Sequence, residues 1–321
     1  MTAATPSLGV LLPTRGLLLR DERPQDANLI LSLARTAEDA GIDSLWVGDS
    51  LTAKPRLEPL TTLAAVAAVT TRARIGTAVL LPALRHPVHG AHIMGTLDVL
   101  SGGRLVVGAG VGGAFNDAQH KEWQTVGVDP KSRVSRLEEW VQIVKRLTRG
   151  DTVSFAGRHF VLDEVAVRPA STREDGVPIL LATHWKTGND QQHRRAMRWG
   201  DGYVGITDTP AEFAKLTARL RRIAEEDRRD FDGLDTAFYM TVNLAADEKT
   251  AEADADTFIR SYYGQNFWKD KWGPFGHPDR VAARIREYGE AGAKTVIVRF
   301  ASLKQEEQLG IFLERVLPNF R

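Results

Sequence analysis

Residues 74–108 read RIGTAVLLPALRHPVHGAHIMGTLDVLSGGRLVVG and hold one complete strand–helix–strand unit. Residues 74–80 form a continuous apolar run, which predicts a strand. Residues 87–100 predict a helix that begins at a proline and is closed by a Ser-Gly-Gly turn, and 104–108 predict the next strand. Strands that are apolar on both faces are typical of a parallel sheet covered on both sides.

The same unit recurs along the chain on both sides of this stretch. Eight strands are predicted, at 8–12, 44–47, 74–80, 104–108, 177–182, 203–206, 236–245 and 295–300. Nine helices are predicted between and after them, at 24–40, 58–70, 87–100, 132–148, 190–199, 210–227, 248–260, 278–291 and 306–316. This alternation predicts a single α/β domain over residues 1–321, a (β/α)₈ TIM barrel, with a doubly wound open sheet as the alternative.

Three segments interrupt the regular alternation. Residues 108–130 are rich in glycine and lack periodicity, so we expect a long functional loop. Residues 152–162 predict a small β-hairpin that turns at 156–157. Residues 261–276 hold six aromatic side chains, which favour either a lid over an apolar small-molecule substrate or a contact between subunits.

The composition excludes several classes of site. The chain has 321 residues, a formal net charge of +1 and no cysteine. Without cysteine there is no disulfide framework, thiolate zinc site, iron–sulfur cluster or cysteine nucleophile. The near-zero charge gives no footprint for a nucleic-acid partner. No signal peptide or membrane-length apolar stretch is evident, so we expect a cytoplasmic protein.

Seven segments, in register, carry a resemblance to a known family. They are 41–47 (GIDSLWV), 74–82 (RIGTAVLLP), 85–87 (RHP), 97–105 (LDVLSGGRL), 108–112 (GAGVG), 153–158 (VSFAGR) and 200–203 (GDGY). In this order they resemble the bacterial luciferase-like family of flavin-dependent monooxygenases and deazaflavin (coenzyme F420)-dependent oxidoreductases. The resemblance implies a homodimer of TIM barrels, each with its cofactor at the carboxyl ends of the strands.

The resemblance also implies roles for particular residues. Asp49 and Ser50 follow the second strand, where the family often places a histidine or an acid facing the cofactor ring. The pair Ala78-Val79 matches a non-proline cis peptide that supports the ring, and Asn116 matches an asparagine beside the cofactor. One deazaflavin subgroup has a catalytic glutamate where this chain has Gly113 or Ala114, so oxidation of a sugar phosphate is not expected.

Glycines and one loop suggest where a cofactor would lie. Gly108-x-Gly110-x-x-Gly113 fits a dinucleotide fingerprint, but no helix pattern follows at once. Clearance for a flat ring at Gly110 is the better interpretation. The loop after the fifth strand could hold a phosphate at a helix N-terminus through Thr183, His184, Trp185 and Lys186, or it is an ordinary loop with a solvated lysine.

Histidines are the candidate metal ligands and proton donors of the sequence. His86, His89 and His92 are spaced by three, but no further ligand completes a metal site, so none is predicted. His86 and His184 are the candidate proton donors, whereas Asp49 and Ser50 could hydrogen-bond the ring or the substrate. Five basic residues near the first two strand ends could attract an acidic cofactor tail or form a wet surface: Arg15, Arg20, Arg23, Lys54 and Arg56.

These observations leave several functions open. Hydride transfer with F420 is favoured slightly. A two-component monooxygenase that uses reduced FMN and O₂ is the alternative, and either cofactor could require a separate reductase. A non-catalytic cofactor-binding barrel belongs to another class. A non-flavin aldolase or isomerase would need a buried lysine or paired carboxylates at strand ends, which the sequence does not clearly offer.

Overall fold

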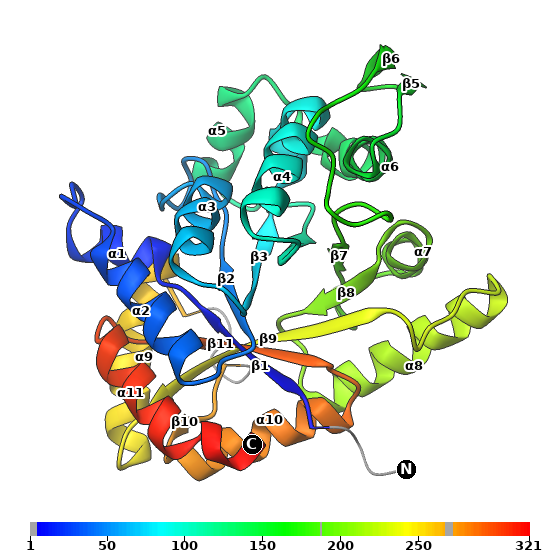
Figure 1. Cartoon of the computed structure of the whole chain (residues 1–321). Helices are drawn as coiled ribbons and strands as arrows, with labels where there is room; N and C mark the ends of the chain where they lie inside the picture. Colours follow the sequence, from blue (N-terminus) through cyan, green and yellow to red (C-terminus); the bar gives the residue numbers. More distant parts are fainter. Residues whose placement is uncertain (1–4, 187, 267–271) are drawn as a thin grey trace.

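A closed barrel of eight parallel strands forms the centre of the molecule (Figure 1). The computed structural model describes residues 5–186, 188–266 and 272–321. The last strand pairs with the first, with Val10 opposite Val298, which closes the sheet and excludes the open-sheet alternative. The predicted TIM barrel is therefore confirmed. Its strands, in barrel order, are β1 (Ser7–Leu11), β2 (Ser44–Val47), β3 (Arg74–Leu80), β4 (Leu105–Ala109), β7 (Ile179–Ala182), β8 (Gly202–Gly205), β9 (Asp235–Leu244) and β11 (Thr295–Phe300).

Helices surround the barrel in Figure 1. Several begin at a proline, which is preorganised for the first helical position. The start of α8 carries a capping box in which Thr209 and Glu212 exchange side-chain and backbone hydrogen bonds. The α-helices are α1 (Thr14–Arg20), α2 (Asn28–Asp39), α3 (Pro59–Val69), α4 (Pro87–Leu100), α5 (Asp117–Thr125), α6 (Arg133–Arg149), α7 (Asp190–Trp199), α8 (Pro210–Glu226), α9 (Glu248–Tyr263), α10 (Pro278–Glu290) and α11 (Gln305–Arg315).

Short elements complete the chain. The predicted hairpin is confirmed as an antiparallel pair, β5 (Val153–Ala156) and β6 (Val161–Val165), which projects from the barrel at the upper right of Figure 1. The two-residue strand β10 (Phe275–Gly276) pairs with the end of β9. Because residues 1–4, 187 and 267–271 lie outside the described part, the single domain over 1–321 stays a prediction.

The prediction missed two helices. The expected loop at 108–130 contains α5, whose cap Asn116 accepts a hydrogen bond from the backbone N–H of Gln119. Only Glu122 and Trp123 are buried on α5, so it lacks an apolar stripe and depends on tertiary packing. The short α1, of 7 residues, contains Gly16 and gives too little periodicity to predict a helix. The predicted helix 24–40 begins later, at Asn28.

A tryptophan fills the barrel interior and supports the upper end of the strands. Trp46 of β2 is 1% exposed. A Cβ added at Gly9 or at Gly76 would lie 2.6 Å from a Trp46 ring atom, so both neighbouring strands need glycine to admit the indole. The interior cluster continues through Leu11, Val106, Leu180, Val204 and Ile297.

At the opposite end of the barrel a buried carboxylate fastens a loop. Glu38, at the end of α2, accepts hydrogen bonds from the backbone N–H groups of Thr71, Arg72 and Ala73, just before β3. Burial alone would raise the pKa of Glu38, but these N–H groups lower it below its usual value because they stabilise the charged form. The carboxylate therefore stabilises the fold in its ionised state.

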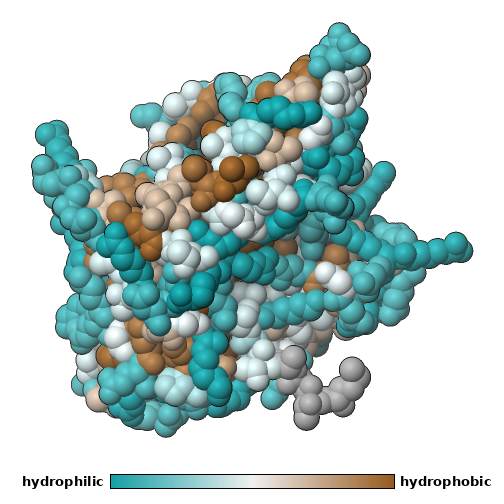
Figure 2. Space-filling view, viewed as in Figure 1, coloured by the Kyte–Doolittle hydropathy of each residue, from teal (hydrophilic) through white to brown (hydrophobic). Residues whose placement is uncertain are grey.

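The outer surface carries a hydrophobic band. Figure 2 shows it crossing the upper part of the visible face, over the region of α3 and α4. Ile93, Val99 and Leu100 of α4 are 48%, 47% and 62% exposed. Contiguous apolar surface of this kind is typical of a contact site. Within the described residues, no helix combines the length and apolar character needed to cross a membrane.

Candidate active site

A cavity of about 230 Å³ opens at the carboxyl ends of the barrel strands. This is the end at which TIM-barrel enzymes carry their active sites. Its lining combines apolar side chains, which we call the apolar wall, with polar ones. The apolar wall consists of Leu11, Ala78, Val79, Leu81, Ala182, Val204 and Ile206, and the polar lining includes Asp49, Ser50, Lys54, Arg56, Gln119, Glu122, His184, Tyr239, Tyr262 and Tyr263.

The peptide bond between Ala78 and Val79 is cis, as the resemblance implied, and both residues line the cavity. Gly110 lies behind them. A Cβ at Gly110 would lie 2.7 Å from Cγ2 of Val79, so the clearance that this glycine provides is for the valine. The prediction that Gly110 clears space for the cofactor itself is thereby corrected to a supporting position.

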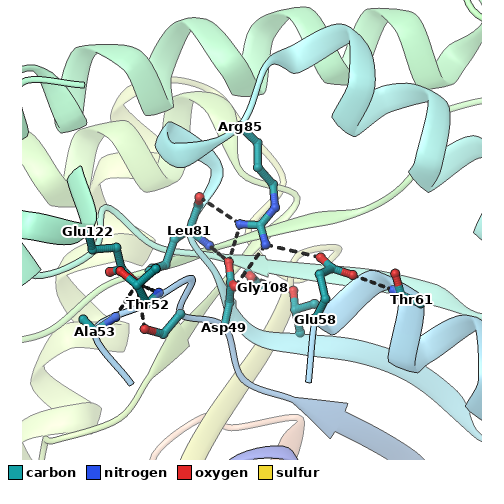
Figure 3. A network of polar contacts seen from close by, with 11 residues as sticks. Asp49, Thr52, Ala53, Glu58, Thr61, Leu81, Arg85, Gly108 and Glu122 are labelled. Atoms are coloured by element: carbon teal, nitrogen blue, oxygen red, sulfur yellow. Dashed lines mark hydrogen bonds and ion pairs between the residues drawn. The ribbon is translucent and has the colours of Figure 1, made fainter. Parts of the chain in front are cut away.

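Asp49 lies in the cavity wall, but protein groups already engage both of its oxygens (Figure 3). Oδ2 accepts from Nη1 of Arg85 at 2.5 Å and from the backbone N–H of Leu81 at 2.8 Å. Oδ1 accepts from Nη2 of Arg85 at 3.0 Å. Burial alone would lower the pKa of Arg85, but the charges of Asp49 and Glu58 raise it. Asp49 therefore positions the segment that follows the cis peptide.

Ser50 and Glu122 form a second buried contact in the same wall (Figure 3). The hydroxyl of Ser50 donates to Oε1 of Glu122 at 2.8 Å. The same oxygen accepts from the backbone N–H groups of Thr52 and Ala53. Glu122 comes from α5 and is 3% exposed. It thus ties α5 to the loop after β2, a role that sequence reasoning missed along with the helix.

The side chain of Gln119 lies against Gly113, which with Ala114 is where the resemblance places the glutamate of one deazaflavin subgroup. A Cβ at Gly113 would lie 2.5 Å from Nε2 of Gln119. Gln119 and Glu122 are three residues apart on α5, so they face the cavity together. The cavity therefore presents an amide and a carboxylate from α5, instead of an acid from position 113.

The two candidate proton donors are separated by the structure. His184 lines the cavity. His86 lies outside the cavity lining: it caps α4, and its ring packs edge-on against His89 and Phe160 near the hairpin. The structure therefore does not bring His86 into the cavity with His184, and its role as a proton donor stays a prediction. Pro87 begins α4 directly after His86, so His86 belongs to the start of this helix. Closeness in sequence to the end of β3 therefore did not place His86 in the cavity.

Asn116 is also outside the cavity lining. Its Oδ1 accepts from the backbone N–H of Gln119 and caps α5. The residue borders a surface groove that adjoins the cavity and shares Ala53, Lys54, Gln119, Tyr262 and Tyr263 with it. A direct contact between Asn116 and a ring in the cavity is thus not supported.

The predicted phosphate loop directs most of its side chains elsewhere. The hydroxyl of Thr183 donates to the carbonyl of Leu181. The ring of Trp185 stacks on that of His193, with 6.5 Å between the ring centroids. The backbone N–H of Trp185 donates to the carboxylate of Asp208. Lys186 is ion-paired with Glu212 at 2.5 Å. Of the four predicted residues only His184 lines the cavity, and the phosphate role of Thr183, Trp185 and Lys186 stays a prediction.

Four cations gather around the rings of Tyr262 and Tyr263, and we call them, Arg15, Lys54, Arg56 and Arg299, the basic cluster. Lys54 and Arg56 line the cavity, and Arg15 borders the adjoining groove. Arg299, on β11, is 2% exposed, and its Nη1 donates to the hydroxyl of Tyr263 at 2.6 Å. Lys54 and Arg56 therefore do not form part of a wet outer surface, as one of the two interpretations had it. Lys54 also supplies a partly buried lysine near the strand ends, a feature that the sequence did not clearly offer.

The aromatic segment 261–276 contributes directly to the cavity lining. Tyr262 and Tyr263, in the last turn of α9, line the cavity. The ring of Trp272 stacks on that of Tyr263, with 6.2 Å between the ring centroids. Phe267 and Trp268 lie outside the described residues. The tyrosines thus belong to the cavity wall, and the choice between a lid and a subunit contact for the remainder of the segment stays a prediction.

Comparison with known proteins identifies relatives along nearly the whole chain. The family model of luciferase-like monooxygenases matches residues 7–295. An F420-dependent glucose-6-phosphate dehydrogenase of Amycolatopsis mediterranei is 28% identical over 91% of this chain and 94% of its own. An uncharacterized protein of Mycobacterium tuberculosis is 32% identical over 64% of this chain and 74% of its own.

Solved structures share the barrel fold. An F420-dependent secondary alcohol dehydrogenase in complex with an F420-acetone adduct superposes with a TM-score of 0.80 and 20% identity over 99% of both chains. A monooxygenase from Streptomyces bottropensis also gives a TM-score of 0.80 and 20% identity, over 98% of this chain and 100% of its own.

Proposed function

Because this chain belongs to the family of luciferase-like monooxygenases, we propose that it is an oxidoreductase that uses coenzyme F420 for hydride transfer to or from an organic substrate. The choice of F420 over FMN is supported by relatives named as F420-dependent dehydrogenases, which match over 91% of this chain. The apolar wall of the cavity at the strand ends is the observation that carries the proposal, because it offers a flat ring a dry surface.

Four residues are proposed to hold the ring. Ala78 and Val79 would form its support, with Ala182 beside them and His184 at the rim. F420, when bound, supplies a carbon centre that donates or accepts a hydride. The protein supplies orientation and the exclusion of water. Asp49 contributes by fixing Leu81, two residues beyond the cis peptide, and Ser50 contributes by joining Glu122 to the wall.

We propose His184 as the group that gives a proton to, or takes it from, the reacting oxygen of the substrate. Of the two histidines considered, it alone lines the cavity. An imidazole titrates near neutral pH and suits general acid–base work. The tyrosines of the cavity lining and the Glu122 carboxylate would then serve to hold the substrate.

The substrate is proposed to differ from glucose 6-phosphate, despite the names of the relatives. In this chain the side chain of Gln119 fills the space next to Gly113. The cavity therefore lacks an acid at the position where the deazaflavin subgroup carries its catalytic glutamate. Incubation of the F420-loaded protein with glucose 6-phosphate should give no reduction of the cofactor, and turnover at the rate of a dehydrogenase would refute this point.

Titration of the purified protein with F420, and separately with oxidised and reduced FMN, tests the cofactor. Tryptophan fluorescence reports binding, since the chain holds 7 tryptophans. Tight binding of F420 and weak binding of FMN is expected. Preferred binding of reduced FMN would replace the proposal with a two-component monooxygenase. Tight binding of F420 without turnover across alcohols, ketones and unsaturated ketones would indicate a non-catalytic barrel.

A cytoplasmic homodimer, supplied by a separate reductase, completes the proposal. The cysteine-free sequence is in keeping with that location. The exposed apolar residues Ile93 and Leu100 on α4 are proposed to lie in the subunit contact. Sedimentation of the wild type and of the double variant Ile93→Glu, Leu100→Lys should give a dimer and a monomer, respectively. Equal mass for both would place the contact elsewhere.

A further inference from the structure

The basic cluster has no carboxylate partner among the described residues, and it shares this with Arg104 and Arg173, whose guanidinium groups instead donate to backbone carbonyls away from the cavity. Arg85 pairs with Asp49, Lys145 with Asp201 at 2.5 Å and Arg195 with Glu138 at 3.2 Å. Among the described residues, no ion pair joins Arg15, Lys54, Arg56 or Arg299 to an acid. What sets the cluster apart is its position, because Lys54 and Arg56 line the cavity without an acid to neutralise them, where a ligand could take that place.

Aromatic rings fix the innermost cation in place. The guanidinium carbon of Arg299 lies 4.9 Å from the ring centre of Trp272, 5.1 Å from that of Tyr262 and 5.3 Å from that of Tyr263. These rings offset part of the cost of burying the charge. Nη2 of Arg299 nonetheless has no hydrogen-bond partner among the described residues. The structure therefore holds a buried donor with unused capacity beside Tyr262 and Tyr263, which line the cavity.

The two cations in the cavity wall are also placed for a ligand. A Cβ at Gly48 would lie 2.4 Å from Nη1 of Arg56, so the guanidinium rests against the backbone at the end of β2 in space that only glycine leaves. The ammonium of Lys54 lies 4.6 Å from the ring centre of Tyr263. Burial lowers the pKa of Lys54, as do the neighbouring arginines, so its charge is present at a cost to the empty protein.

We propose that the basic cluster is an oxyanion subsite, which binds a phosphate or carboxylate group of a ligand whose reacting part lies in the cavity. A doubly or singly charged oxyanion would accept hydrogen bonds from Arg56 and Lys54 and lie in the positive field of Arg15 and Arg299. The adjoining groove, bordered by Arg15 and Lys54, gives a long ligand a path outward. The ligand is thus not wholly apolar, in contrast to the expectation from the aromatic segment.

Direct binding of inorganic phosphate tests the subsite without reference to any reaction. The full chain is titrated with phosphate and with pyrophosphate at low ionic strength, and binding is followed by calorimetry. Potassium chloride at equal ionic strength is the control for screening. We expect saturable binding that Arg56→Gln and Lys54→Gln each weaken about tenfold or more, as loss of a charge-assisted hydrogen bond implies. The matched control Arg221→Gln removes the same charge from an exposed pair with Asp232 and should bind as the wild type does.

Stability without ligand separates a binding role from a structural one. Because Lys54 is desolvated and faces like charges, Lys54→Gln should melt at or above the wild-type temperature when no anion is present. A lower melting temperature with unchanged phosphate binding would overturn the proposal. So would the absence of saturable phosphate binding to the wild type, or binding that potassium chloride reproduces.

Two sources of the oxyanion are distinguished with the cofactor. F420 carries a phosphate tail, and the deazaflavin riboside without that tail is the comparison. If Arg56→Gln weakens F420 but not the riboside, the subsite holds the cofactor's phosphate. If it weakens neither while phosphate binding is lost, the subsite holds the substrate. If the wild type fails to bind F420 yet phosphate binding still requires Arg56, the proposed cofactor is wrong and the subsite stands.

Discussion

Asp49→Asn separates a positioning role for this residue from direct contact with the cofactor. The side chain of Asp49 is 1% exposed and that of Arg85 19% exposed, and two hydrogen bonds join them. Removing one partner of a buried ion pair costs about 3–5 kcal/mol, because the other charge stays buried. Glu58 remains 3.3 Å from Arg85, and the Asn oxygen can still accept from Leu81, so the lower end, about 3 kcal/mol, is expected.

Urea unfolding of the wild type and of Asp49→Asn measures this loss, and F420 titration of the same samples measures cofactor affinity. Glu58→Gln is the control: its side chain is 45% exposed, so a loss of less than about 1 kcal/mol is expected. Asp49→Asn combined with Arg85→Gln should recover part of the stability, because no unpaired charge then stays buried. Wild-type stability together with lost F420 binding would refute the positioning argument and return Asp49 to the ring.

Three other predictions address the loop before β3, the α5 contact and the proton donor. Glu38→Gln should lower stability by about 2 kcal/mol at neutral pH, since charged hydrogen bonds to backbone N–H groups are lost. Because the pKa of Glu38 is lowered in the folded state, the contribution is full above its unfolded value of 4.5 and is lost as the pH falls through the folded value, so melts of wild type and variant should converge in acid. A gap that stays constant with pH would contradict this. Glu122→Ala should cost about 2 kcal/mol, whereas Glu122→Gln, which keeps an acceptor for Ser50, should cost under about 1 kcal/mol; equal losses would show that the charge matters more than the hydrogen bonds. His184→Gln should reduce kcat, measured at saturating F420, by about 10²-fold or more, and an unchanged kcat at every pH would remove His184 from the reaction.

The barrel could be predicted from the sequence because its strands are locally distinctive. The run Arg74–Leu80 and the helix Pro87–Leu100 have the predicted bounds in the structure. Their signals are an apolar run and a proline at the first helical position, which act within a few residues. The helix α5 gives no such signal, since only Glu122 and Trp123 are buried on it. Its stability depends on contacts distant in the sequence, which a periodicity argument does not include.

In the site, too, features with a recognisable sequence signal were predicted, and features that depend on contacts between distant segments were missed. The cis peptide at Ala78-Val79 and the position of His184 in the cavity agree with the family resemblance, which carries information about three-dimensional neighbours. Arg299 was missed because it lies in an apolar strand, where the sequence pattern gives no sign that its side chain reaches Tyr262 and Tyr263 of α9. Asp49 and Lys186 were predicted to act on a ligand, but each is paired with a residue of another segment, Arg85 and Glu212, respectively. The sequence pattern does not show such pairs.

The fit between Gln119 and Gly113 also bears on how this chain and its relatives could have diverged. A glutamate introduced at position 113 would meet Nε2 of Gln119, since even a Cβ there lies 2.5 Å from it. That atom is the far end of a flexible side chain, so Gln119 could rotate and admit the acid without being replaced. The two arrangements of this site are therefore separated by one side chain and the rotamer of its neighbour, within an unchanged fold.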